Sequence, residues 1–220
     1  MPQRPPRILA FAGSLRAQSY NKRVAENAAA GARAAGAEVR VLNLQEYALP
    51  VYDADLFDSV AGDPHALEAS GGKVGGPHAK PMPEGLLRLK EHFRWADGWI
   101  VSVPMHNGTY TASLHNLIDW LTRMAPGERP LDNISRKVIG VVSCVFAGSG
   151  SMAIGDFKRL MTTLGSIVVP GNAVVTITTH DEMFDEDGKL RDREIGRAVE
   201  STGARVAKFV EKLGLTGHGD

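Results

Sequence analysis

Short apolar segments alternate with helix-like segments along most of this chain. The apolar segments predict strands at residues 8–11, 38–42, 99–103, 137–144 and 167–177, the last of them interrupted by Pro170-Gly171. The segments between them repeat apolar residues at helical intervals, which predicts helices at residues 24–35, 86–96, 111–123, 156–164 and 194–213. Because parallel strands need long crossover connections, this alternation favours a parallel sheet with helices on both faces.

The loops that follow the strands are the expected ligand-binding segments. In a doubly wound sheet, such loops gather at the carboxyl ends of the strands, around the point where the strand order reverses. Three loops of this chain qualify, at residues 13–21, 104–110 and 146–150. We therefore expect these three loops to lie together at one edge of the sheet.

The first of these loops has the composition of a phosphate-binding turn. Just before the predicted helix it supplies hydroxyls, a guanidinium and an amide, from Ser14, Arg16, Ser19 and Asn21. A helix N-terminus already favours an anion, and charge-assisted hydrogen bonds contribute roughly 1.5–3 kcal/mol each, so a phosphate monoester could bind without a metal. The alternative is an ordinary N-capped helix after a tight turn. Neither the mononucleotide P-loop pattern nor the dinucleotide glycine fingerprint occurs in this loop.

The overall charge of the chain argues against several classes of partner. Lysine and arginine number 25 and aspartate and glutamate number 25, so the formal net charge is zero. A neutral chain lacks the general attraction to nucleic acid or to an anionic membrane, and a small-molecule partner is expected instead. No stretch approaches the length of a membrane span and residues 1–7 contain no apolar leader, so we expect a cytoplasmic protein.

The expected domain organisation is a single domain over residues 1–220, because a chain of this length with 43% apolar residues can bury one full core. One segment departs from the alternation. Residues 59–83 are rich in glycine and proline and show neither helical nor strand periodicity. We interpret this insertion either as a solvated loop or as a lid or arm that reaches a neighbouring subunit.

Metal binding and cysteine chemistry are not expected. His65 and His78 match no usual metal-ligand spacing, and the acidic run at residues 181–188 has Met183 where a calcium loop needs an oxygen ligand. We interpret that run as a solvated turn. The sole cysteine, Cys144, cannot form an internal disulfide and ends an apolar segment, so we expect a small buried residue rather than a nucleophile.

The second loop completes a family resemblance. It reads Pro104-Met105-His106-Asn107-Gly108-Thr109-Tyr110 and leads into the polar and apolar residues of 113–120. Together with residues 13–21 and with Leu49-Pro50-Val51-Tyr52-Asp53, it resembles the NADPH-dependent FMN reductases of the flavodoxin-like superfamily. The resemblance covers nearly the whole chain outside residues 59–83. It implies a flavodoxin-like, doubly wound α/β fold with a five-stranded parallel sheet in the order 2-1-3-4-5.

The resemblance also implies an activity. Members of that family pass hydride from NADPH or NADH through bound FMN to a second acceptor, such as a quinone, an azo compound, free flavin or a metal species. Because the flavin carries the chemistry, we expect no catalytic acid, base or nucleophile whose loss abolishes turnover. The family further implies a homodimer or homotetramer with the flavin near the subunit boundary.

Matching positions give the flavin contacts that the resemblance implies. The first loop would hold the FMN phosphate, through Ser14, Arg16, Ser19 and Asn21, with Tyr20 nearby. The second loop would line the isoalloxazine ring, with Pro104, Met105, His106, Asn107 and Gly108. The third loop would flank the ring from the other side, with Ser143, Gly148, Ser149 and Gly150.

Two departures from the family pattern keep other functions open. His106 stands where the family commonly has a tyrosine that packs against the flavin, and residues 146–150 are less glycine-rich than the family's third loop. A histidine can become protonated near neutral pH, so His106 could tune the flavin if it faces the ring; the alternative is a histidine turned to solvent. The second candidate function is a non-enzymatic flavodoxin-like electron carrier, although such carriers usually dock through a strongly acidic face. The third is a scaffold that has lost the cofactor.

Overall fold

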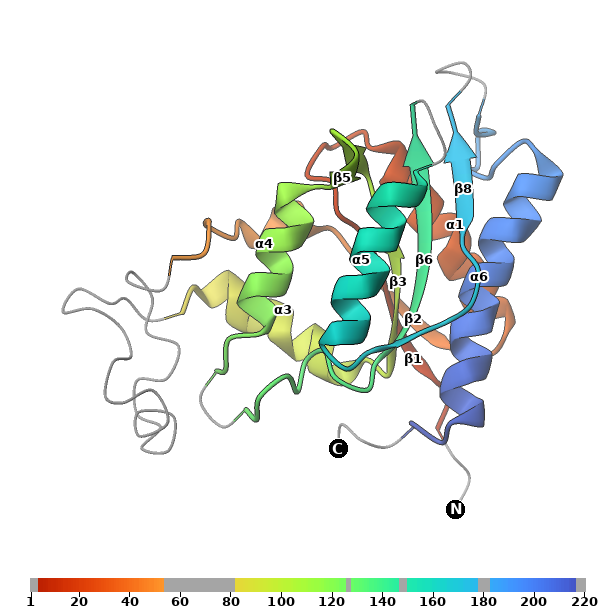
Figure 1. Cartoon of the computed structure of the whole chain (residues 1–220). Coiled ribbons are helices and arrows are strands. Elements are labelled where there is room, and N and C mark those ends of the chain that lie inside the picture. The colour runs from red at the N-terminus through yellow and green to blue at the C-terminus, as the bar shows by residue number, and fades with distance from the viewer. Residues whose placement is uncertain (1–3, 54–81, 126–127, 147–149, 178–182, 217–220) are drawn as a thin grey trace, which may run out of the picture.

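A parallel β-sheet runs through the centre of the protein (Figure 1). The computed structural model describes residues 4–53, 82–125, 128–146, 150–177 and 183–216. Within these ranges the central sheet has six strands in the order β2-β1-β3-β6-β7, with β8 also paired to β6. The strands are β1 (Arg7–Ala12), β2 (Glu38–Leu42), β3 (Gly98–Ser102), β6 (Val138–Val145), β7 (Ile167–Val168) and β8 (Ala173–Thr176).

The order of the strands is the predicted one. Both β7 and β8 pair in parallel with β6, from Val138 opposite Ile167 to Val145 opposite Thr176. Pro170-Gly171 separates the two short strands, because proline has no N–H to donate to a strand ladder. The prediction of a doubly wound α/β sheet in the order 2-1-3-4-5 is therefore confirmed, with the fifth strand in two pieces.

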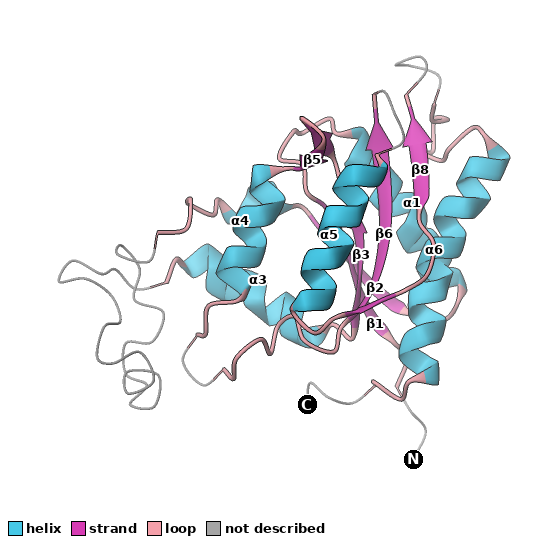
Figure 2. Ribbon diagram, viewed as in Figure 1, coloured by secondary structure: helices cyan, strands magenta, loops and turns pink. Residues whose placement is uncertain are grey.

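Helices cover both faces of this sheet (Figure 2). Side chains along β1 alternate between the faces, so that Ile8 and Ala10 join a core with α1 and α6, whereas Leu9 and Phe11 join a core with the other helices. The helices are α1 (Tyr20–Ala34), α3 (Glu84–Trp95), α4 (Ala112–Leu121), α5 (Ser151–Thr163), α6 (Arg193–Lys212) and the short 3-10 helix η1 (Leu44–Tyr47).

The helix predicted at residues 156–164 begins earlier than the sequence suggested. Its first residue is Ser151, because Ala153, Ile154 and Phe157 continue one buried face of α5. Gly155 lies on the exposed side of α5 and does not interrupt that face, since nothing lies within 4 Å of the place where its Cβ would stand. The predicted start at residue 156 is therefore wrong by more than one helical turn.

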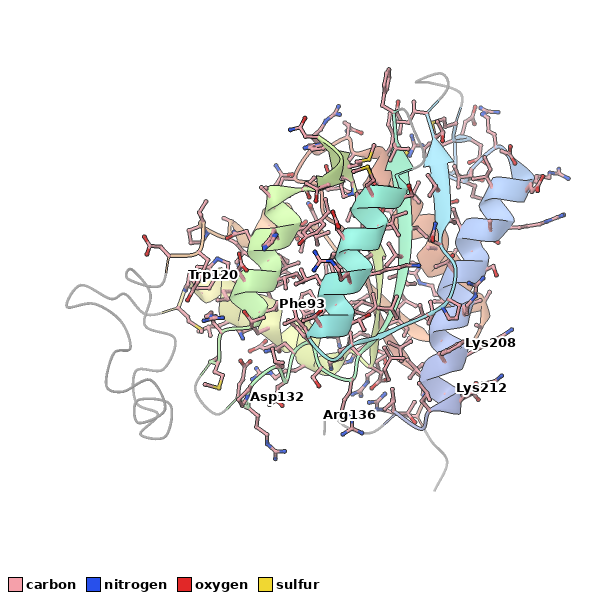
Figure 3. All side chains as sticks on the ribbon, viewed as in Figure 1. Phe93, Trp120, Asp132, Arg136, Lys208 and Lys212 are labelled. Atoms are coloured by element: carbon pink, nitrogen blue, oxygen red, sulfur yellow. The ribbon has the colours of Figure 1, made fainter. Side chains whose placement is uncertain are left out.

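A close contact between two helices fixes α1 on its face of the sheet. A Cβ at Gly31 would lie 1.9 Å from the backbone oxygen of Glu200, and a Cβ at Gly203 would lie 1.8 Å from that of Ala28. No side chain fits at such distances, so the two glycines allow α1 and α6 to pack backbone against backbone. The outer side of α6 faces solvent, where Figure 3 shows Lys208 and Lys212 pointing away from the sheet.

A buried ion pair attaches the connection between α4 and β6 to helix α3. Lys90 Nζ lies 2.7 Å from Glu128 Oε2, and both side chains are almost fully buried. The same carboxylate oxygen accepts a hydrogen bond from the backbone N–H of Ala125 at 2.8 Å, and Lys90 also donates to the backbone oxygen of Arg123. Such a pair is costly to break, because the remaining partner would stay buried and charged.

The acidic run at residues 181–188, which the sequence predicts to be a turn, does form a turn in the part that the structure describes. The backbone N–H of Gly188 donates to the backbone oxygen of Asp185 at 3.0 Å, and that of Lys189 donates to Asp185 Oδ1 at 2.8 Å. Glu186 and Asp187 between them are exposed. The prediction of a solvated turn is therefore confirmed for residues 185–188, but Phe184 is buried in the core, and residues 181–182 lie outside the described ranges.

Most of the expected insertion also lies outside the described residues. Of residues 59–83, the structure describes only Met82 and Pro83, and Pro83 is the N-cap of α3. Among the helices that the structure describes, none combines the length and the apolar character needed to cross a bilayer.

Candidate functional site

The three expected ligand loops leave the sheet at the carboxyl ends of β1, β3 and β6. In Figure 1 the arrowheads of β6 and β8 and the short strand β5 (Thr109–Tyr110) of the second loop lie at the same end of the sheet. The backbone N–H of Gly13 donates to the backbone oxygen of Ser102 at 3.0 Å, and that of Val103 donates to Val142 at 2.8 Å. The loops therefore start from adjacent strands.

The start of the first loop is held tightly against the second loop and α4. A Cβ at Gly13 would lie 2.9 Å from Leu114 Cβ and 3.1 Å from Pro104 Cδ, so a larger residue would push these elements apart. The backbone oxygen of Gly13 accepts hydrogen bonds from Thr111 Oγ1 at 2.7 Å and from Ser113 Oγ at 2.6 Å. Glycine at this position thus sets the position of the residues that follow.

Those following residues present an anion-binding donor set. Ser14 is half-buried and Arg16 is exposed, and the backbone N–H of Arg16 donates to Ser14 Oγ at 3.3 Å. Ser19 is the N-cap of α1, but its side chain makes no capping hydrogen bond, and the first turn of α1 contains no acidic residue. Helix N–H groups in the first turn have no partner within the helix, so the positive end of α1 lies beside a hydroxyl that makes no capping hydrogen bond, and Arg16 stands three residues before Ser19 in the chain. This chemistry fits a phosphate dianion.

Tyr20 does not extend this donor set through its ring. The ring is stacked on Phe184, with centroids 6.0 Å apart and planes 6° from parallel. Arg23 lies on the same aromatic residue, with its guanidinium carbon 4.2 Å from the ring centroid. The Tyr20 side chain therefore packs against the segment that precedes α6.

Asn21 is likewise turned into the fold. Its side chain is buried, and Nδ2 donates to the backbone oxygen of Cys144 at 2.8 Å. Its Oδ1 accepts hydrogen bonds from Ser102 Oγ at 2.7 Å and from the backbone N–H of Cys144 at 2.9 Å. The expectation of a side-chain contact with phosphate is not tested by these bonds, but they give the amide a clear structural partner.

The second loop folds as a small β-hairpin that the sequence analysis missed. Its strands are β4 (Met105–His106) and β5 (Thr109–Tyr110), which pair in an antiparallel register. Asn107 and Gly108 form the turn with φ angles of 53° and 84°. Two positive φ angles are typical of a type I′ turn, for which Asn-Gly is the strongest short-range sequence signal. His106 and Asn107 are exposed at the tip, whereas Pro104 at the base is buried.

Side chains from α4 and α5 anchor the hairpin. Tyr110 Oη lies 3.0 Å from His115 Nδ1, and the Tyr110 ring packs edge-on against Phe157 with centroids 5.8 Å apart. Thr109 Oγ1 donates to Asp156 Oδ2 at 3.3 Å. Burial, with a smaller contribution from Asp156, raises the pKa of Tyr110, which therefore stays a neutral phenol. The hairpin tip is thus presented from a fixed base.

The third loop begins beside the second. Ser143 is buried and its Oγ donates to the backbone oxygen of Val103 at 2.6 Å. Gly150 has a φ of 62°, and a Cβ there would lie 3.0 Å from Val145 Cγ1. Gly148 and Ser149, the other expected contacts of this loop, lie outside the described residues.

Two large apolar residues at this edge were not identified from the sequence. Phe146 and Met152 are 69% and 66% exposed, at the end of β6 and in the first turn of α5. Met152 Cε lies 3.5 Å from the place where a Cβ on Gly108 would stand, so the start of α5 lies close to the turn of the second loop. Exposed apolar residues next to a polar donor set are typical of a ligand edge. A large apolar residue directly after a buried strand was the only sequence signal for Phe146.

Cys144 at the same edge is not a nucleophile. It is 4% exposed, and burial raises the pKa of its thiol to about 12. The thiolate is the reactive form, so the thiol of Cys144 reacts slowly while the protein stays folded. The expectation of a small buried residue is confirmed. Within the described ranges, no three His, Cys, Asp or Glu side chains come together in a way that could hold a metal ion.

A parallel sheet in the order 2-1-3-4-5, with a loop rich in hydrogen-bond donors after the first strand at the switch point, defines a flavodoxin-like α/β protein. Within that class, the family model described as "NADPH-dependent FMN reductase" matches residues 6–181, and the chain belongs to this family. It is accordingly an NAD(P)H-dependent oxidoreductase that uses FMN. The donor set at the start of α1 fits the phosphate of that cofactor.

Individual proteins agree with this assignment. The chain is 30% identical over 209 residues to a quinone reductase of Escherichia coli, covering 94% of this chain and 96% of that protein. It is 24% identical to an NAD(P)H-dependent FMN reductase of Pseudomonas aeruginosa over 208 residues, with 94% and 96% covered. Among solved structures, the flavoenzyme NAD(P)H:(acceptor) oxidoreductase FerB of Paracoccus denitrificans has the same fold, with a TM-score of 0.69, 22% identity, and 94% and 98% of the two chains covered.

Proposed function

We propose that FMN binds across the three loops, with its phosphate on the first loop and its ring against the second and third. The observation that carries this proposal is the start of α1, where the N-cap Ser19 makes no side-chain capping hydrogen bond and the first turn contains no acidic residue, with Ser14 and Arg16 a few residues earlier in the chain. The first-turn N–H groups of α1, including that of Asn21, would complete the phosphate contacts. Tyr20 would support this turn from outside through its stacking on Phe184.

The ring would lie against the hairpin tip and the start of α5. When bound, FMN accepts hydride from NAD(P)H and passes electrons to a second substrate. His106, Asn107 and Gly108 would offer backbone and side-chain contacts to the ring, with Pro104 and Met105 at its base. From the third loop, Ser143, Gly148, Ser149 and Gly150 would border the other side. These groups bind, orient and exclude water, and the reaction needs no protein acid, base or nucleophile.

The second substrate is proposed to be a small acceptor such as a quinone, an azo compound, free flavin or a metal species. Support comes from the E. coli relative, which is named a quinone reductase. The exposed apolar surfaces of Phe146 and Met152 suit a planar organic acceptor better than a hydrated ion.

We further propose that the protein is a cytoplasmic homodimer or homotetramer built from single domains. Support comes from the resemblance to the family, and Val51 and Leu15, which are 81% and 49% exposed, are apolar residues that such an interface would cover. Light scattering of the purified protein after gel filtration tests the oligomeric state, and a monomeric mass would contradict it.

The FMN site is tested with Arg16→Ala. This variant should purify with little bound flavin, because it loses a charge-assisted contact worth roughly 1.5–3 kcal/mol, or about tenfold to a hundredfold in affinity. Arg33→Ala is the matched control, since it removes the same charge from the exposed last turn of the same helix. The measurement is the flavin absorbance per protein, followed by bleaching of that absorbance with NADPH in the absence of oxygen. An Arg16→Ala protein as yellow as the wild type would refute the phosphate assignment.

A further inference from the structure

Asn21 lies where the central sheet loses a strand partner. β3 ends at Ser102, but its neighbour β6 continues to Val145. The backbone oxygen of Val142 faces β3, because it accepts the N–H of Val103. Alternate residues of a strand point their backbone groups the same way, so the N–H and C=O of Cys144 also face the β3 side, beyond the end of that strand.

The side-chain amide of Asn21 replaces the missing strand. Its Nδ2 donates to the backbone oxygen of Cys144 at 2.8 Å, and its Oδ1 accepts the backbone N–H of Cys144 at 2.9 Å. One amide therefore exchanges two hydrogen bonds with one residue of β6, as a peptide group would. The hydroxyl of Ser102 donates to the same Oδ1 at 2.7 Å, which ties β3 into the arrangement. The side chain is buried, so these bonds are protected from water.

We propose that Asn21 is a positioning residue for flavin binding, whose amide fixes the start of α1 against the ends of β3 and β6. This inference rests on the FMN site proposed above. Asn21 is the second residue of α1, two residues after the N-cap Ser19. β3 leads into the second loop and β6 into the third, so this one amide sets the spacing among all three loops.

A positioning role and a direct phosphate contact have different effects on the binding of FMN and riboflavin. A residue that touches only the phosphate contributes to FMN binding but not to the binding of riboflavin, which lacks the phosphate. A residue that holds all three loops in place contributes equally to both ligands, because the ring and ribityl contacts depend on it as well. The ratio of the two dissociation constants therefore distinguishes the two roles.

The first test compares FMN and riboflavin binding by quenching of flavin fluorescence in the wild type, Asn21→Ala and Arg16→Ala. Asn21→Ala should weaken the binding of both ligands by a similar factor of roughly ten, because the buried backbone N–H and C=O of Cys144 lose their hydrogen-bond partners. Arg16→Ala should weaken FMN much more than riboflavin. The proposal is overturned if Asn21→Ala weakens FMN and leaves riboflavin binding unchanged.

The second test needs no flavin. Cys144 is the sole cysteine, so the rate of its reaction with an aromatic disulfide reagent reports how well the end of β6 is held. Without ligand, Asn21→Ala should react roughly tenfold faster than the wild type, and Arg16→Ala should react at the wild-type rate. An unchanged rate in Asn21→Ala would overturn the proposed positioning role.

A milder variant keeps the test decisive if Asn21→Ala does not fold. Ser102→Ala removes one of the three hydrogen bonds and leaves the two to Cys144 intact. Compared with Asn21→Ala, it should raise the thiol reaction rate less and should weaken the binding of FMN and of riboflavin by smaller factors that match each other. A loss of affinity for FMN alone would contradict the proposal. If the wild type itself binds neither flavin, the proposed FMN site fails, while the thiol rates still decide the role of Asn21.

Discussion

At the scale of single residues, Lys137 makes the free energy of unfolding depend on pH. It lies just before β6, and its Nζ donates to the backbone oxygen of Ala96. Burial lowers the pKa of Lys137 from its usual 10.5 to about 8, although the nearby Asp97 and Asp132 act in the opposite direction. The unfolded chain therefore holds this proton more tightly than the folded protein does.

That difference predicts a pH-dependent free energy of unfolding. Between pH 8 and 10.5 the unfolded state binds more protons, so stability should rise with pH, by up to about 1.4 kcal/mol per pH unit. Below pH 8 the penalty for charging the buried amine is fully present. The measurement is urea unfolding from pH 7 to 10 for the wild type and Lys137→Met, which lacks the titrating group. The free energy of unfolding of the wild type minus that of Lys137→Met should rise with pH.

Lys208→Met is the matched control for this prediction. Lys208 is exposed on α6 and points away from the sheet (Figure 3). Its removal should leave the pH dependence parallel to that of the wild type. If the wild type and Lys137→Met differ by a constant amount across this range, the assigned shift is wrong.

Residue roles were the least predictable part of the site. The sequence correctly led to a buried Cys144, because an apolar run surrounds it on the strand. The phosphate contact expected of Asn21 stays a prediction, based on the chemistry of an amide beside a helix N-terminus, but its structural role was not predicted. Its partners Ser102 and Cys144 lie 81 and 123 residues away, and only the folded sheet shows that β6 outlasts β3 at this point.

At the scale of elements, the same substitution should have opposite effects in two helices. Gly203→Ala places a Cβ 1.8 Å from the backbone oxygen of Ala28, so α1 and α6 must separate, at a cost of roughly 1–3 kcal/mol. Gly155→Ala in α5 meets nothing within 4 Å and should stabilise the protein by roughly 0.5–1 kcal/mol through helix propensity. Urea unfolding of both variants measures the difference. Equal effects of the same sign would contradict the close packing of α1 on α6.

Element boundaries followed burial more than local signals. The strand at residues 38–42 was predicted with its observed bounds, since five extended residues end at a clear turn. The start of α5 was missed, because the buried face begins at Ala153, three residues before the predicted start. The hairpin of β4 and β5 was missed because each strand has only two residues, although Asn107-Gly108 carried its signal.

At the scale of the whole molecule, the fold class came from the alternation of segments and the strand order came from the family resemblance. Periodicity alone cannot choose an order, because each strand of a parallel sheet reads as a similar apolar run. The meeting of the three loops was predictable, since carboxyl ends of parallel strands share one edge. The approach of Met152 to Gly108 was not, because it depends on how the second loop and the start of α5 are placed in space.

This arrangement predicts that flavin binding stabilises the whole chain as one unit. The three loops come from strands of one sheet, so FMN at about a hundred times its dissociation constant should add about 2.7 kcal/mol to the unfolding free energy. For a domain of this size that corresponds to a rise in melting temperature of roughly 5–10 °C. Circular dichroism in the far and near ultraviolet should show one unfolding transition, and FMN should raise the temperature of the whole transition.

Two controls belong to this measurement. Riboflavin at the same concentration should raise the melting temperature less, and Arg16→Ala should lose most of the FMN-dependent rise. Two transitions, of which FMN moves only one, would mean that the chain contains more than one cooperative unit.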